Sequence, residues 1–162
     1  MEAIYESSFL RMVYFPLEKL LEATWLEGTK MMNKDLYREE MLTYINHYNK
    51  YQVDLLLVDE QQLFFKIEPD LQIWVSEIIK RKTEQDVEKL AIVLSEGTAQ
   101  KLASEQIMKK PNFAHLNTLF FESKEDAKNW LINNDVKQSK RPVLLYNNEY
   151  ADRFKFVRVF NP

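Results

Sequence analysis

Two neighbouring carboxylates stand at the end of a leucine-rich apolar segment of the chain. Residues 53–59 read Val-Asp-Leu-Leu-Leu-Val-Asp, and Asp59 and Glu60 lie where this segment ends. The composition is typical of a buried strand, and open α/β sheets place ligand sites at the carboxyl ends of such strands. Two carboxylates there could transfer protons or hold Mg²⁺. Adjacent residues at a strand end usually point apart, however, and no nucleophile accompanies them, so hydrogen bonding within the next loop is the favoured interpretation.

A second polar group follows the next apolar segment, residues 90–94. Ser95, Gly97 and Thr98 stand between this segment and a helical pattern. Free backbone N–H groups at a helix start can bind an anion. Helix capping by Ser95 or Thr98 explains the same residues, and it is the favoured interpretation.

The remaining reactive residue types are sparse. His47 and His115 are the only histidines, and neither has a second ligand at metal-binding spacing. The basic run Lys80, Arg81, Lys82 is more typical of a helix end that complements the dipole than of a binding patch. The chain has no cysteine, which excludes disulfides and thiol chemistry, and its two glycines cannot supply a glycine-rich phosphate loop. We therefore expect neither enzymatic activity nor a cofactor.

The composition narrows the class of protein. A net charge of -3 and a pI near 5.5 argue against a nucleic-acid-binding protein. The 162 residues, 46% of them apolar, suit one domain with a substantial core. No run of about 18 apolar residues is present and the first residues do not resemble a signal peptide. We expect a soluble, cytoplasmic protein without membrane insertion.

The pattern of apolar residues predicts an α/β sheet that positions these groups. Strands are expected at residues 9–15, 20–26, 53–59, 90–94 and 116–121. Helices are expected after the N-cap Asn33, from Pro69, from about Ala99 and after the N-cap Ser123. The first two strands are close enough to form an antiparallel hairpin, and the other three are linked through helices by right-handed crossovers. The sequence thus predicts a mixed five-stranded sheet with about four helices, in the order β-β-α-β-α-β-α-β-α.

A tail follows the predicted domain. The domain is expected to span residues 1–134 and the tail residues 135–162, which begin with a polar link. Residues 143–145 and 153–160 are apolar and strand-like, and the second segment contains three phenylalanines, Phe154, Phe156 and Phe160. Such a segment should not stay exposed to water. We expect it to pack on its own domain or on a partner subunit, and a homodimer formed through the tail is slightly favoured.

The element order resembles that of a STAS domain, the fold of anti-sigma-factor antagonists and their SpoIIAA-like relatives, over roughly residues 8–134. In STAS domains the central strand ends at an Asp, followed by a spaced apolar pair, an Asp-Ser-Ser-Gly turn and a helical Leu. Aligned without gaps, the Asp falls on Asp59, the apolar pair on Leu63 and Phe65, and the helical Leu on Leu71.

The phosphorylation chemistry of that family is missing from this sequence. The two serines of the turn, one of which accepts phosphate in the antagonists, fall on Glu68 and Pro69, and the Gly falls on Asp70. A Glu beside a helix start could resemble a permanently charged state, but a favourable first-turn carboxylate is the simpler interpretation. The resemblance therefore implies the fold and a role in bacterial signalling, without a serine phospho-switch.

Together these observations predict a non-enzymatic protein-interaction or regulatory module whose protein partner is not identified by the sequence. The candidate interaction surface comprises Asp59, Glu60, Gln61, Glu68, Asp70, Ser95, Glu96, Gly97 and Thr98. The alternative is a protein that binds a small apolar or anionic molecule in the same crevice, at the carboxyl ends of the strands. Phe64, Phe65 and Trp74 would then line the site.

Overall fold

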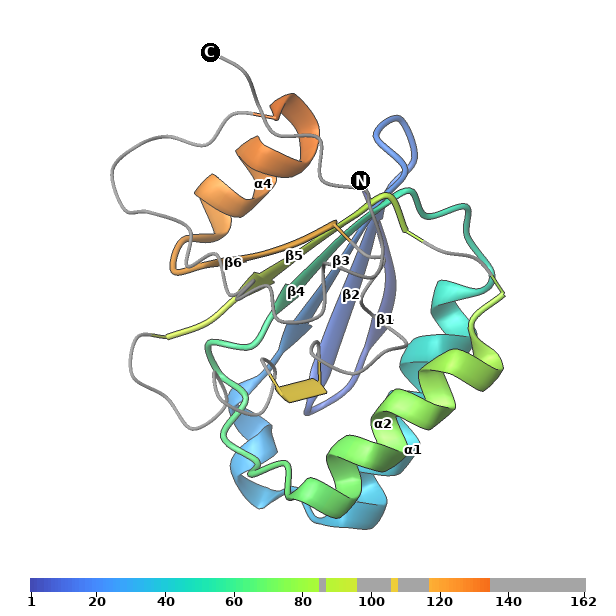
Figure 1. Cartoon of the computed structure of the whole chain (residues 1–162), viewed down its shortest axis with the longest axis vertical. Helices are drawn as coiled ribbons and strands as arrows, with labels where there is room; N and C mark the ends of the chain where they lie inside the picture. The colour runs from blue at the N-terminus through green and yellow to red at the C-terminus, as the bar shows by residue number, and fades with distance from the viewer. Residues whose placement is uncertain (85–86, 96–105, 108–116, 135–162) are drawn as a thin grey trace, which may run out of the picture.

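A computed structural model describes residues 1–84, 87–95, 106–107 and 117–134, and these residues form an α/β fold around a mixed six-stranded sheet (Figure 1). The strands are β1 (Glu2–Glu6), β2 (Leu10–Phe15), β3 (Leu20–Trp25), β4 (Leu55–Asp59), β5 (Lys89–Val93) and β6 (Asn117–Phe121). The helices of the described residues are the 3₁₀ helix η1 (Glu27–Met31) and the α-helices α1 (Lys34–Tyr48), α2 (Pro69–Lys82) and α4 (Lys124–Asn133).

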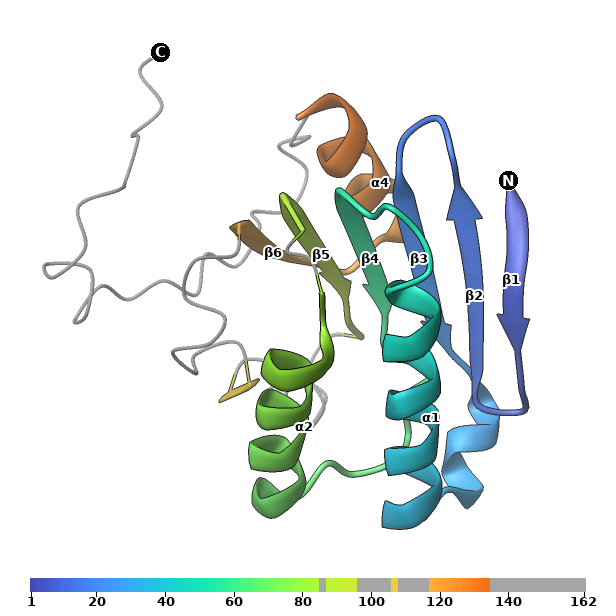
Figure 2. The same ribbon diagram turned by 90° about the vertical axis from the view of Figure 1, so that its right-hand side faces the viewer.

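The strands lie in the sheet in the same order as in the chain. β1, β2 and β3 pair antiparallel, and β3, β4, β5 and β6 pair parallel. α1 connects β3 to β4 and α2 connects β4 to β5, and both connections step across the sheet in the same direction. Right-handed crossovers of this kind place their helices on the same face. α1 and α2 lie on one face of the sheet, and α4, which follows the last strand, lies on the other (Figure 2). β4 has β3 and β5 as neighbours, so the prediction that this segment is a central strand is confirmed.

The predicted number of strands was wrong, because the sheet has six strands instead of five. The additional strand is β1, which pairs antiparallel with β2 and whose register shifts between Ala3 and Tyr5. Ala3, Ile4 and Tyr5 are consecutive apolar residues between two glutamates, which gives no period-two alternation. β1 is stabilised by its pairing with β2, and a local sequence pattern does not reveal such pairing. The predicted hairpin of β2 and β3 is confirmed.

Most predicted boundaries differ from the observed ones by a residue or two. The central strand begins at Leu55 instead of Val53, which is buried just before it. Of the third predicted helix, residues 106–107 are helical and the rest lies outside the described residues. The tail, residues 135–162, also lies outside them, so neither its strand-like character nor the homodimer is tested.

The predicted helix starts are confirmed where local contacts define them. Asn33 Oδ1 accepts hydrogen bonds from two backbone N–H groups of the first turn of α1, at 3.0 and 2.9 Å. Pro69 is the first residue of α2, where its missing N–H costs nothing. Ser123 Oγ accepts a hydrogen bond from the Asp126 N–H at 3.4 Å. Each cap depends on residues close in sequence, which is why the sequence alone predicts it.

The sheet divides the core into two clusters. The larger lies between the sheet and α1 and α2, and the smaller lies under α4, which packs over β4, β5 and β6. The smaller cluster consists of the buried residues Leu20, Leu57, Ala91, Val93, Ala127, Trp130 and Leu131. Alternation along each strand sends neighbouring side chains to opposite clusters, so β4 and β5 are apolar on both faces, as a doubly covered strand must be.

Candidate functional site

The described members of the predicted interaction surface lie at one end of the sheet. The carboxyl ends of the parallel strands and the starts of α1 and α2 share this end (Figure 2). Open α/β sheets place binding sites in this position. The loop that follows β4, residues 60–68, runs from the strand end to the first turn of α2.

Asp59 ends β4 as a buried carboxylate that is 7% exposed. Its Oδ1 accepts a hydrogen bond from the Gln61 N–H at 3.1 Å, so the predicted role in loop hydrogen bonding is confirmed. Burial raises the pKa of Asp59, and the Gln61 N–H and the nearby Lys124 offset this rise in part. The net effect is a pKa above the ordinary range of an aspartate.

Glu60 is the first residue of the loop after β4. Its N–H donates to the Val93 carbonyl at 2.8 Å, which ties the loop to β5. Burial raises the pKa of Tyr37 and Tyr44, both on α1, and the negative charge of Glu60 raises it further. The Asp59 carboxylate lies 3.9 Å from Lys124 Nζ on α4, so the two neighbouring acids act on different helices.

Gln61 and Ser95 are brought together, as the sequence predicted for the ends of neighbouring strands. The Gln61 side chain donates from Nε2 to the Glu122 carbonyl at 3.0 Å, and Ser95 Oγ donates to the Gln61 carbonyl at 3.4 Å. These bonds connect the segments that follow β4, β5 and β6. The remaining members of this predicted group, Glu96, Gly97 and Thr98, lie outside the described residues.

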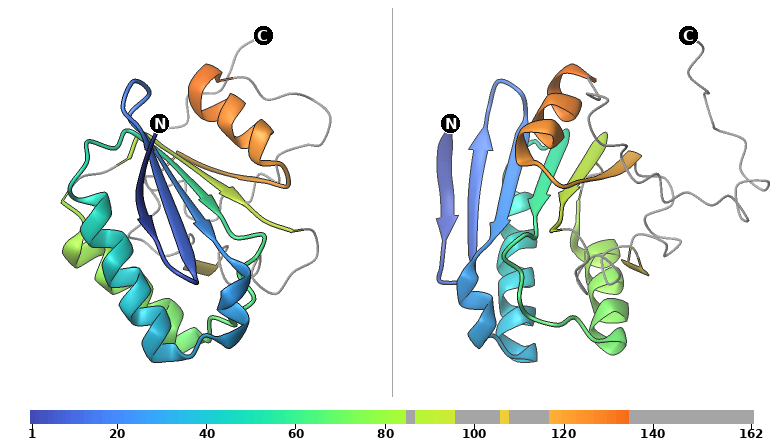
Figure 3. Two further views of the ribbon diagram at one scale, coloured as in Figure 1. Left: turned by 180° about the vertical axis from the view of Figure 1, so that it is seen from behind. Right: turned by 90° about the vertical axis from the view of Figure 1, so that its left-hand side faces the viewer.

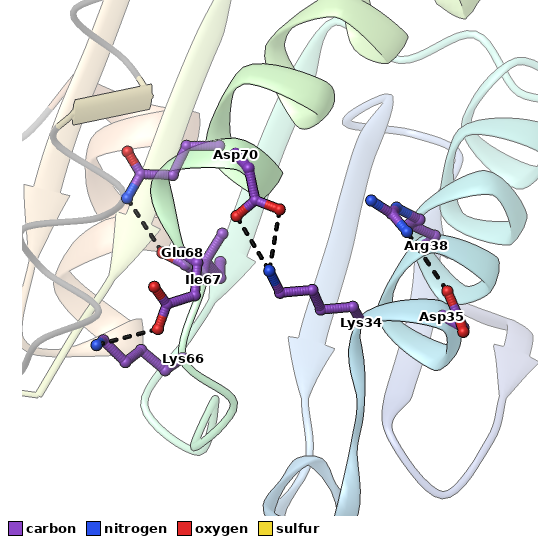
Figure 4. A network of polar contacts seen from close by, with 8 residues as sticks. Lys34, Asp35, Arg38, Lys66, Ile67, Glu68 and Asp70 are labelled. Atoms are coloured by element: carbon purple, nitrogen blue, oxygen red, sulfur yellow. Dashed lines mark hydrogen bonds and ion pairs between the residues drawn. The ribbon is translucent and has the colours of Figure 1, made fainter.

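Glu68 and Asp70 form a separate group at the start of α2 (Figure 4). Glu68 precedes the helix without capping it, and its Oε1 lies 3.1 Å from Lys66 Nζ. Asp70 Oδ2 lies 2.9 Å from Lys34 Nζ at the start of α1, and hydrogen bonding from Lys34 lowers the pKa of Asp70. Both pairs are solvent-exposed, so each contributes little to stability. The predicted surface thus consists of two polar groups joined by the loop after β4.

A buried threonine that the sequence did not single out holds this loop. Thr29 in η1 is fully buried, and its Oγ1 lies 2.9 Å from the Leu26 carbonyl and 2.8 Å from the Gln62 carbonyl. The hydroxyl donates to one of these carbonyls and accepts a hydrogen bond from the Phe64 N–H at 2.9 Å. Thr29 therefore fastens the loop to η1, across 35 positions of sequence.

Apolar side chains anchor the same loop on both sides of an exposed phenylalanine. Leu63 and Ile67 are buried, with 2% and 5% of their surface exposed, whereas Phe64 between them is 48% exposed. Lys30 Nζ lies 4.6 Å from the centroid of the Phe64 ring, and the next residue, Met31, is 83% exposed. We call Lys30, Met31 and Phe64 the η1–loop surface.

The three aromatic residues proposed to line a small-molecule site have different surroundings. Phe65 packs against the larger core and stacks on Tyr37 with ring centroids 5.3 Å apart. Trp74 lies beside the Arg38 guanidinium, 5.7 Å from ring centroid to Cζ. Phe64 faces solvent beside Lys30. Phe65 therefore packs in the core, and Trp74 contacts α1 from α2.

An ionic cluster under α4 was not predicted from the sequence. Glu22 projects from the middle of β3, and its side chain is 10% exposed. Its Oε1 forms an ion pair with Lys124 Nζ, and its Oε2 lies 2.7 Å from Lys128 Nζ without the angle of a directed hydrogen bond. Lys124 Nζ also donates to Thr24 Oγ1 at 3.2 Å and lies 3.9 Å from Asp59 Oδ2.

The charges in this cluster balance one another. Burial alone raises the pKa of Glu22, but Lys124 and Lys128 together outweigh burial and hold the pKa below its ordinary value. Both lysines lie in the first turns of α4, where the helix dipole disfavours cations, and the two carboxylates offset this cost. The arrangement fastens α4 to the sheet and leaves no nucleophile or free base.

A sequence signal for this cluster existed. Glu22 stands in an otherwise apolar strand, and Lys124 and Lys128 are spaced i, i+4 on one helix face. The sequence does not show that this helix returns to that strand.

His47 is not part of a metal site in the part of the chain that the structure describes. No group of three or more His, Asp or Glu residues there could hold a metal ion. His47 lies against the Tyr5 ring, with centroids 5.0 Å apart. Burial lowers the pKa of His47, and the positive charge of Lys50 lowers it further. His115 lies outside the described residues.

Comparison with known proteins does not add a family. No protein-family model matches the chain, and no significant match was found among curated proteins or solved structures. Among residues 1–84, 87–95, 106–107 and 117–134, no helix is long and apolar enough to cross a membrane.

Proposed function

We propose that this chain is a non-enzymatic interaction module of the STAS type, acting in bacterial signalling without a serine phospho-switch. Its partner-binding region is the η1–loop surface together with Glu68 and Asp70 at the start of α2. The order of the described elements supports the resemblance, as does the burial of Leu63 and Leu71 at matching positions. Residues 60–71 contain no Ser, Thr or Tyr, so a kinase finds no acceptor there.

The observation that carries the proposal is the rigid display of Phe64. The loop around it is fixed by Thr29 and anchored by Leu63 and Ile67, yet the Phe64 ring remains 48% exposed. A loop already held in one conformation loses little entropy on binding. Exposed aromatic residues on such loops are typical centres of protein interfaces.

One charged group lies against this aromatic residue, and two ion pairs lie near the start of α2. Lys30 lies over the Phe64 ring, and Figure 4 shows the Lys66–Glu68 pair and the Lys34–Asp70 pair. Rim charges of both signs orient a partner and change its association rate more than its final affinity. The proposed interface therefore has an apolar centre and a mixed-charge rim, which suits a folded protein partner better than a nucleic acid.

A comparison of captured partners tests the proposal. The chain is used as bait in a lysate of its own source cells, beside a Phe64→Ser variant and a Leu17→Ser control. Leu17 is 95% exposed in the turn between β2 and β3, at the opposite end of the sheet, so the control removes an even more exposed apolar side chain elsewhere. We expect Leu17→Ser to retain the partner and Phe64→Ser to lose it.

The affinity for a purified partner then measures the size of the effect. Truncating a hot-spot aromatic costs about 2 kcal/mol or more, so we expect a Kd at least about thirtyfold weaker for Phe64→Ser. Glu68→Lys should mainly slow association. Equal binding by Phe64→Ser and the unaltered chain would place the interface elsewhere, and turnover of a metabolite by the purified chain would contradict a non-enzymatic role.

A further inference from the structure

Half of one sheet face carries no helix in the described part of the chain. α4 packs over β4, β5 and β6, and no described helix lies over β1 or most of β2 on the same face (Figure 3). Ala3 and Val13 are paired there across β1 and β2, and the exposed Glu6–Arg11 ion pair follows on the same face. Ala3 is exposed and Val13 is half-buried, whereas Phe15 at the end of β2 packs against the cluster under α4. An additional segment on this open half would cover Ala3 and Val13.

β1 forms the edge of the sheet beside this open half. Among the residues that the structure describes it pairs on one side only, with β2. Glu2 and Glu6 stand at its two ends, and Glu6 pairs with Arg11 in an exposed ion pair. An edge strand exposes backbone donors and acceptors that can accept another strand. A segment that pairs here should be apolar on one side and carry positive charge.

Residues 153–160 read Arg-Phe-Lys-Phe-Val-Arg-Val-Phe and come close to this description. In an extended conformation Phe154, Phe156 and Phe160 share one side with Arg158. The three charges in the segment are all positive. The opposite sign of the charges on β1 favours this edge of the sheet as the place where the segment binds.

The chain is long enough for the segment to reach β1 in the same molecule. α4 begins near Asp59 and ends near the start of β5, where Lys89 Nζ donates to the Leu131 carbonyl at 2.9 Å. β1 begins at the same end of the sheet because it is parallel to β3. Residues 135–152 can extend to about 60 Å at roughly 3.3 Å per residue. The path across the sheet is about 25 Å at about 4.8 Å per strand.

We propose that residues 153–160 pair with β1 of the same chain as an additional edge strand, with their phenylalanines beside the open half of the sheet face. A tethered segment is present at an effective concentration of about millimolar, which favours its own domain over a second copy. This inference is independent of the proposed function, since it concerns the far edge of the sheet and a different face.

Cross-linking in the full-length chain tests the proposal, because the chain contains no cysteine. Arg158→Cys, whose side chain shares the side of the phenylalanines, is combined in turn with Ala3→Cys and Glu6→Cys, which cover more than one register on the open face of β1. The matched control places the first cysteine at the opposite edge, as Asn117→Cys, where the side chain is also exposed. We expect at least one of the two β1 pairs to form an intrachain cross-link about tenfold faster than the Asn117 pair, at a rate independent of protein concentration.

A second measurement separates docking from random encounters of a flexible tail. Phe154→Ser, Phe156→Ser and Phe160→Ser together, in the same cysteine variants, should reduce the rate to that of the Asn117 pair. Faster reaction at Asn117, equal rates at both edges, or a rate unaffected by the serines would overturn the proposal. Cross-linked dimers in place of monomers would assign the β1 edge to the tail of a second copy and would overturn it as well.

Discussion

Lys128 Nζ on α4 lies 2.7 Å from Glu22 Oε2 on β3, and this contact joins the last described helix to the middle of the sheet. Lys124 holds the other carboxylate oxygen of Glu22. The Glu22 side chain is 10% exposed, while both lysines keep about a third of their side-chain surface in solvent. The position of α4 therefore depends on one buried charge with two partly exposed partners.

Replacing this charge should destabilise the fold. We expect Glu22→Gln to lower the free energy of unfolding by about 1–3 kcal/mol, the usual cost of losing hydrogen bonds to a charged group. The cost stays below that of a fully buried broken pair because Lys124 and Lys128 can turn to water. Urea unfolding at neutral pH measures the change.

Glu6→Gln is the matched control for this substitution. Glu6 also stands in the sheet with a cationic partner, Arg11, but its side chain is 57% exposed. An exposed pair is worth less than about 1 kcal/mol. Equal losses for Glu22→Gln and Glu6→Gln would show that burial of the cluster does not matter.

Glu22 and Asp59 should affect acid stability in opposite directions. The pKa of Glu22 is lower in the folded chain, so its stabilisation is present above the unfolded pKa and is lost as the pH falls through the folded pKa. The pKa of Asp59 is raised, so its charged form disfavours the fold at neutral pH and this penalty disappears on acidification.

Asp59→Asn isolates the second effect. Asn keeps an Oδ1 that can accept from the Gln61 N–H, and it removes the charge. We expect the variant to be at least as stable as the unaltered chain at pH 7, with an advantage that shrinks as the pH approaches 3.8, the ordinary pKa of the group. Urea unfolding from pH 7 to pH 4 tests this. An advantage that grows on acidification would contradict the raised pKa.

Gly28 should not tolerate any side chain. A Cβ at this position would lie 2.1 Å from the Ser8 carbonyl oxygen, in the backbone of the turn between β1 and β2. Because backbone must shift to relieve this contact, Gly28→Ala should cost about 1–3 kcal/mol. Glu27→Ala, at the exposed neighbouring position, should stay within about 0.5 kcal/mol. A Tm of Gly28→Ala equal to that of the unaltered chain would sink the prediction.

Removing the Thr29 hydroxyl should loosen the loop after β4. Thr29→Val keeps the shape but leaves the Phe64 N–H and one carbonyl without this partner, at a cost of about 1–3 kcal/mol. Hydrogen exchange at the Phe64 amide should accelerate, and partner binding should weaken if the rigid loop is the interface. Thr29→Ser retains the hydroxyl and should behave nearly as the unaltered chain. Unchanged exchange in Thr29→Val would show that other contacts fix the loop.

The sequence alone determined the features that depend on residues close to one another. The Asn33 and Ser123 caps, the start of α2 at Pro69 and the central position of β4 could each be read from a few neighbouring residues. Local hydrogen bonds and side-chain periodicity depend on the segment itself, so they can be predicted without knowing how the rest of the chain folds.

Only the tertiary structure decided which distant residues meet. β1 forms because β2 offers it an edge, and Glu22 is buried and charged because α4 brings two lysines back to β3. Thr29 controls the loop after β4 because η1 packs beside residues that follow much later in sequence. Such contacts have no local pattern, since their energy comes from desolvation and pairing that exist only once the sheet has assembled.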